Sequence, residues 1–129
     1  MEYRQVKSYL VVFLGSGIGG MLRHAFNGVL PRLLGFAFPY PTLVVNVLGS
    51  TILGLLAGYF AVKADPGQTW RLFLTTGMLG GFTTFSAFSL DTVLFYERGE
   101  IALGFVYVSA SVLVSALALY AGLVFMRTA

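Results

Sequence analysis

Four long apolar stretches fill almost the whole of the 129-residue chain, and they decide what it can fold into. A helix that crosses the hydrocarbon core of a membrane needs about 20 mostly apolar residues. Four such spans fit, at about residues 8–30, 42–62, 70–96 and 100–126. Only 10% of the residues are charged, against about a quarter in a soluble domain. The sequence predicts an all-α membrane protein with a single transmembrane domain, residues 1–129, whose short connections make consecutive helices antiparallel neighbours.

Several other classes of protein are excluded or disfavoured. The chain has no cysteine, which removes disulfides and thiolate metal sites. Gly15, Gly17 and Gly20 match the dinucleotide-binding pattern G-x-G-x-x-G, but no acidic residue lies between Glu2 and Asp65, where that reading requires one. The net charge of +3 forms no basic run, so nucleic acid is not an expected partner. The first apolar stretch has no small-residue cleavage site, so we interpret it as a retained helix that stops at Pro31, not as a signal peptide.

The distribution of Lys and Arg near the helix ends bears on orientation in the membrane. The side of the N-terminus is expected to carry five of them, and the other side two; the five are Arg4, Lys7, Lys63, Arg71 and Arg127, and the two are Arg32 and Arg98. This bias favours a cytoplasmic N-terminus modestly, and a small chain with a modest bias can insert both ways. Small residues recur four apart, as in Gly15 and Gly19, or Gly77 and Gly81. Such spacing predicts close helix packing, and because four helices enclose little, we expect a homodimer.

Hydrogen-bond donors lie inside the predicted spans, where acids are nearly missing. Arg23 lies eight residues before Pro31, or about 12 Å from that end of its helix, and a charge at such depth suggests function. Asn46 is expected at a similar depth on the next helix. On the fourth helix Tyr107, Ser111 and Ser115 share one stripe. Asp91 is the one acid well inside a span, so this donor-rich pathway suits an anion, although each group could also simply join helices.

The stretch GGFTTFSAFS, residues 80–89, predicts a break in the third helix near the middle of the membrane. Gly80 and Gly81 each cost about 1 kcal/mol in a helix interior relative to Ala, and the hydroxyls of Thr83 and Thr84 compete for backbone groups. Freed carbonyls at such a break can hold a small cation. Phe85 and Phe88 share a face just beyond it; their positive ring edges can touch an anion, although such a pair is also ordinary in a core.

The whole pattern resembles the Fluc (CrcB) family of fluoride channels. The resemblance rests on GGMLRH in the first helix, PTLVVNVLGS in the second, GMLGGFTTFSAFS in the third, and the three hydroxyls of the fourth. It implies an antiparallel, dual-topology homodimer in the bacterial cytoplasmic (inner) membrane, with two pores that export fluoride passively and no catalysis.

The resemblance also implies roles for individual residues. Arg23 is similar to the family's vestibule arginine, and the main-chain carbonyls of Gly80 and Thr83, from both subunits, would hold a structural sodium ion. The expected fluoride pathway comprises Phe85, Phe88, Asn46, Ser86, Tyr107, Ser111, Ser115 and Thr42. Ala87 departs from the family, because many members have Thr or Ser there, and the charge bias is lopsided for dual topology. Two alternatives stay open: a small four-helix proton-coupled multidrug exporter, for which Asp91 is the only candidate acid, and a non-transporting assembly partner.

Overall fold

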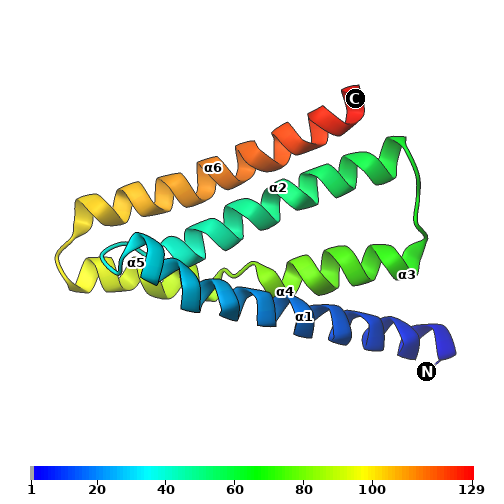
Figure 1. Cartoon of the computed structure of the whole chain (residues 1–129), viewed down its shortest axis with the longest axis horizontal. Coiled ribbons are helices and arrows are strands. Elements are labelled where there is room, and N and C mark those ends of the chain that lie inside the picture. Colours follow the sequence, from blue (N-terminus) through cyan, green and yellow to red (C-terminus); the bar gives the residue numbers. More distant parts are fainter. Residues whose placement is uncertain (1) are drawn as a thin grey trace.

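The computed structural model describes residues 2–129, which form long helices joined by short loops (Figure 1). Three uninterrupted helices are α1 (Tyr3–Leu34), α2 (Tyr40–Val62) and α6 (Ile101–Thr128). The third span is built from four successive pieces, which are α3 (Gln68–Arg71), the π-helix η1 (Leu72–Leu79), α4 (Gly80–Phe82) and α5 (Ser86–Glu97). Within the described residues, four segments are long and apolar enough to cross a membrane, as predicted.

The prediction that the first helix stops at Pro31 is wrong, because α1 continues to Leu34. Proline keeps a helical φ and forfeits only its own N–H bond, a smaller loss in the last turn than in mid-helix. The helix ends where Gly35 adopts a φ of 96°, and the Gly35 N–H donates to the Pro31 carbonyl at 2.9 Å. Pro41 lies in the first turn of α2, where a missing N–H costs nothing.

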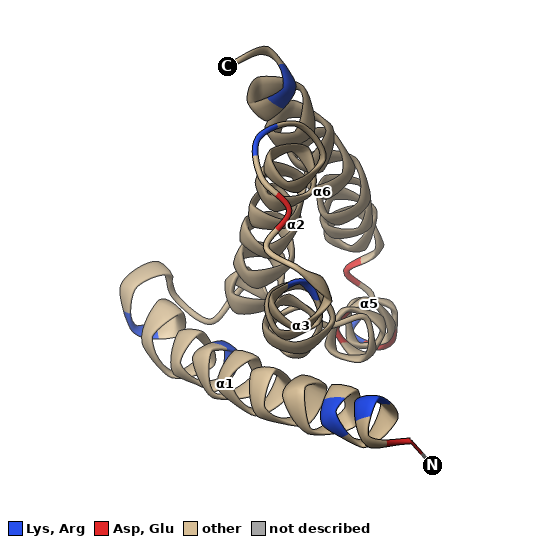
Figure 2. Ribbon diagram, turned by 90° about the vertical axis from the view of Figure 1, so that its right-hand side faces the viewer, with Lys and Arg blue, Asp and Glu red and all other residues tan. Residues whose placement is uncertain are grey.

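The helices pack as two pairs, and both termini lie at the same end of the molecule (Figure 1). α6 runs along α2, and α1 runs along η1 and α4. Figure 2 looks onto the end that carries the termini and shows α1 crossing beneath the third span, away from α6. The predicted close packing of glycines is confirmed: a Cβ added to Gly15 would lie 2.9 Å from the Gly77 Cα, and one added to Gly81 would lie 2.9 Å from the Ser16 Cα.

The apolar core within one chain is small. Among the described residues, Val45, Phe82, Phe95 and Tyr107 are the buried large apolar side chains, while many others, such as Phe13 and Leu117, are mostly exposed. Exposed apolar side chains lie on all four spans, and they are unfavourable in water and favourable in hydrocarbon. The fold therefore has the surface of a multi-pass membrane protein.

Candidate functional site

The site is organised by an interruption in the third span. α4 ends at Phe82, Thr83 has an extended backbone (φ −80°, ψ 159°), and α5 begins at Ser86. Gly80 and Gly81 stay helical, so the interruption starts just after both glycines. The missing side chain of Gly81 serves the close approach of α1 at Ser16. An interruption of this kind frees backbone groups that must find other partners when they are buried.

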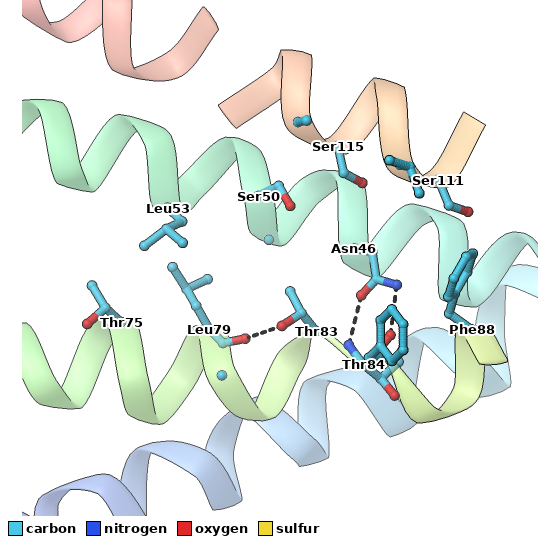
Figure 3. Close-up of a pocket in the computed structure, with 15 residues that line it drawn as sticks. Asn46, Ser50, Leu53, Thr75, Leu79, Thr83, Thr84, Phe88, Ser111 and Ser115 are labelled. Carbon is cyan, nitrogen blue, oxygen red and sulfur yellow. Dashed lines mark hydrogen bonds between the residues drawn. The ribbon is translucent and has the colours of Figure 1, made fainter. Parts of the chain in front are cut away.

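Asn46 of α2 satisfies both backbone groups of Thr84. Its Oδ1 accepts from the Thr84 N–H at 2.8 Å, and its Nδ2 donates to the Thr84 carbonyl at 2.9 Å, as the dashed lines in Figure 3 show. A side-chain amide has the same donor and acceptor as a peptide unit. Asn46 thus pairs with Thr84 as a neighbouring strand would.

Arg23 of α1 reaches the same interruption from the other side. Its Nε donates to the Gly81 carbonyl at 3.2 Å. The Thr84 hydroxyl oxygen, in turn, accepts from the Ala87 N–H at 3.1 Å and caps the start of α5. The carbonyls of Gly80 and Thr83 are among those that accept no hydrogen bond from residues 2–129.

An open pocket of about 480 Å³ lies beside the interruption and between α2 and α6 (Figure 3). It brings together seven of the residues singled out from the sequence, namely Asn46, Gly80, Thr83, Phe85, Phe88, Ser111 and Ser115. The rings of Phe85 and Phe88 lie 5.5 Å apart between centroids, tilted by 50°. No acidic residue lines the pocket within the described part of the chain.

The hydroxyls of Ser111 and Ser115 are buried and have no hydrogen-bond partner among residues 2–129. Other hydroxyls in the spans behave differently: Thr51, Thr75 and Thr92 each donate to the carbonyl four residues earlier, at 2.7 to 2.8 Å. Buried polar groups without partners are rare in folded proteins. Two of them on one wall of one pocket indicate a place where a ligand, water or another chain supplies the partner.

Four of the predicted site residues lie outside the pocket. Tyr107 is fully buried behind Phe88, with ring centroids 5.4 Å apart, and its hydroxyl donates to the Asp91 carboxylate at 2.8 Å. Thr42 is buried beside the Tyr107 hydroxyl. Ser86 is exposed, and its hydroxyl lies 3.3 Å from that of Thr84. Arg23 lies behind the interruption, as described above.

Some lining residues were not predicted as part of the site. Ser50 follows Asn46 by one helical turn, shares its face and lines the pocket. Thr84 was predicted only to help interrupt the third helix, although its backbone N–H and carbonyl both bond to Asn46. Thr75 lines the pocket from η1, and the π-helical register of that segment gives no periodic signal in the sequence.

Comparison with known proteins places the chain in a family. The sequence model described as "CrcB-like protein, Camphor Resistance (CrcB)" matches residues 10–123. The chain is 56% identical over 120 residues to a protein of Rhodopseudomonas palustris (strain BisB5), covering 93% of this chain and 97% of the relative. It is 55% identical over 121 residues to one of Granulibacter bethesdensis, covering 94% and 95%. It is 48% identical over 122 residues to one of Rhizobium johnstonii, covering 95% and 97%.

All three relatives are named "Fluoride-specific ion channel FluC". The matches run through the spans that carry Arg23, Asn46, the interruption and the serines of α6. The resemblance drawn from the sequence motifs is confirmed, and the chain belongs to the CrcB-like protein family.

Proposed function

We propose that this chain forms a passive, fluoride-selective channel that exports fluoride from the bacterial cytoplasm across the inner membrane and so protects the cell from fluoride toxicity. The observation that carries the proposal is the pocket lined by a pair of phenylalanines and by two buried serine hydroxyls that have no hydrogen-bond partner among residues 2–129. Relatives that share about half of the sequence over nearly its whole length bear the name of fluoride channels.

The chemistry of the pocket suits a small anion that must lose its water. A channel can replace the hydration shell of an ion with groups that line the pore. The Ser111 and Ser115 hydroxyls each offer a donor, and the Asn46 amide retains a second N–H after its bond to Thr84. The edges of Phe85 and Phe88 carry the positive end of the ring quadrupole and attract an anion weakly, so the ion is not trapped.

Two copies of the chain are part of the proposal. Phe85 is 77% exposed and the pocket is open, so one chain alone does not seal a path through a membrane. An antiparallel, dual-topology homodimer would cover both surfaces and provide two pores. The carbonyls of Gly80 and Thr83 accept no hydrogen bond from the described residues and fit a small cation that takes oxygen ligands. They would hold a structural sodium ion, whose charge would join the two interrupted spans at the dimer axis.

The multidrug exporter is the alternative with the least support. Its mechanism requires a deep carboxylate that binds either a proton or the cationic substrate, so that the movement of one is exchanged for the other. Asp91 is the one acid well inside a span, and it accepts a hydrogen bond from the fully buried Tyr107 instead of lining the pocket.

A flux measurement on purified protein tests the proposal. Liposomes loaded with potassium fluoride and treated with valinomycin are expected to release fluoride, whereas matched liposomes loaded with chloride retain it. Phe85→Ile and Phe88→Ile are expected to lower fluoride flux, because an aliphatic side chain of similar size has no positive edge. Equal release of chloride would contradict selectivity, and unchanged flux in both variants would favour an assembly role.

A further inference from the structure

The two polar side chains that are most unexpected in an apolar bundle converge on one short backbone segment. Arg23 comes from α1 and Asn46 from α2, and they contact residues 81 and 84 on either side of the interruption. We propose that Asn46 and Arg23 are positioning residues: they replace the helix hydrogen bonds lost at the interruption and thereby fix the start of α5, which carries Phe88. The consequences for flux rest on the proposed channel function, whereas the backbone clamp itself does not.

The lost and replaced bonds can be compared one by one. In an uninterrupted helix, each N–H donates to the carbonyl four residues earlier. The Thr84 N–H would donate to Gly80, the Phe85 N–H to Gly81, and the Phe88 N–H to Thr84. In this chain, Asn46 takes the Thr84 N–H and the Thr84 carbonyl, and Arg23 takes the Gly81 carbonyl. Side chains from two different helices therefore substitute for one group in each of these three lost bonds.

The clamp also decides which carbonyls are left over. With the Thr84 N–H on Asn46, the Gly80 carbonyl loses its helical donor. With the Ala87 N–H on the Thr84 hydroxyl, the Thr83 carbonyl loses its donor too. These two oxygens are the proposed sodium ligands. Asn46 thus affects both the proposed sodium ligands and the helix that carries Phe88. By holding Thr84, it leaves the carbonyls of Gly80 and Thr83 free, and it positions the Thr84 hydroxyl that caps α5.

This role makes specific demands on the residue types. Asn46 must both accept and donate, which an aspartate at the same length does only in part, because a carboxylate accepts from the Thr84 N–H but does not donate to the Thr84 carbonyl. Arg23 needs a donor only at the Nε position. Glutamine places its amide nitrogen at that same position along the side chain without charge, and methionine places a methyl group there.

Hydrogen exchange of the Thr84 backbone amide tests the proposed role of Asn46 directly and does not require transport. In 15N-threonine-labelled protein, Asn46→Asp is expected to keep Thr84 exchange close to wild type. Asn46→Leu is expected to accelerate that exchange about tenfold or more, since an unmet buried donor corresponds to roughly that factor. Equal Thr84 exchange in both variants would overturn the clamp. Where Asn46→Leu yields no folded protein, fast Thr84 exchange in Asn46→Asp would also overturn the clamp, because that variant retains the acceptor.

Fluoride flux from liposomes tests the Arg23 half and separates positioning from simple attraction of anions by charge. Arg23→Gln is expected to conduct about tenfold better than Arg23→Met, because only Gln restores the bond to the Gly81 carbonyl. Arg32→Gln, which removes an exposed charge at the same end of α1, controls for charge alone. If fluoride flux falls equally in Arg23→Gln and Arg23→Met, Arg23 acts through its charge, and the proposal that it is a positioning residue fails. If wild-type protein passes no fluoride, the channel function fails, while the exchange result at Thr84 still stands.

Discussion

At the scale of single residues, the two serines of α6 are the sharpest targets for mutation. Ser111→Ala and Ser115→Ala each remove a buried hydroxyl that has no partner in residues 2–129. Because a hydrogen bond to a charged group contributes roughly 1.5–3 kcal/mol, we expect each change to lower fluoride flux about tenfold or more without lowering the melting temperature of the protein. Ser109→Ala, on an exposed position of the same helix, is the matched control. Flux equal to that of the control would remove these hydroxyls from the pathway.

The residue types of the site were predictable from the sequence, but their hydrogen bonds were not. Arg23, Asn46 and the serines stand out because polar groups are rare in an apolar span. Their partners depend on which backbone groups the third span leaves free, and that in turn depends on the residue at which the helix stops. Asn46 therefore emerged as a pore residue from its polarity, and as the partner of Thr84 only from the contact itself.

At the scale of helices, the glycines give a matched pair of stability tests. A Cβ at Gly81 would lie 2.9 Å from the Ser16 Cα, so Gly81→Ala must push α1 and the third span apart. Overpacking of this kind costs roughly 1–3 kcal/mol. A Cβ added to Gly17 of α1 would have no neighbouring-helix or side-chain atom of residues 2–129 within 4 Å, so Gly17→Ala is expected to be neutral or to stabilise by up to about 1 kcal/mol through helix propensity. Thermal unfolding in detergent measures both, and similar melting temperatures for the two variants would contradict the packing.

The lengths of the apolar stretches predicted four spans, because the bilayer sets a minimum length that the sequence displays directly. The end of α1 was missed because proline near a helix terminus removes a bond that matters little there. The π-helix η1 was not predicted at all. Its bonding pattern differs from that of an α-helix by one residue, and nothing in the apolar composition of residues 72–79 selects between them. Tertiary contact with α1 at Gly15 and Gly77 is available only in the folded chain.

At the scale of the whole molecule, the positions of the Lys and Arg residues relative to the termini bear on how the chain is oriented in the membrane. Both termini and the loop between α2 and α3 lie at one end (Figure 1), and five of the eight Lys and Arg residues lie near them in the chain, namely Arg4, Lys7, Lys63, Arg71 and Arg127. The charge bias favours the orientation with a cytoplasmic N-terminus. An antiparallel dimer requires instead that both orientations are made in similar amounts.

Labelling of single cysteines measures that outcome, because the chain has none of its own. Ala64→Cys lies in the loop at the end of the termini, and Ala37→Cys lies in the loop at the opposite end; both positions are exposed. With an impermeant thiol reagent applied to intact cells, dual topology predicts that each variant is labelled to about half of the value reached after permeabilisation. Insertion in one orientation only, with the N-terminus in the cytoplasm as the charge bias favours, predicts instead that Ala37→Cys is labelled almost fully and Ala64→Cys hardly at all. The second pattern would contradict the antiparallel dimer, because no chains of the opposite orientation would be present to form it.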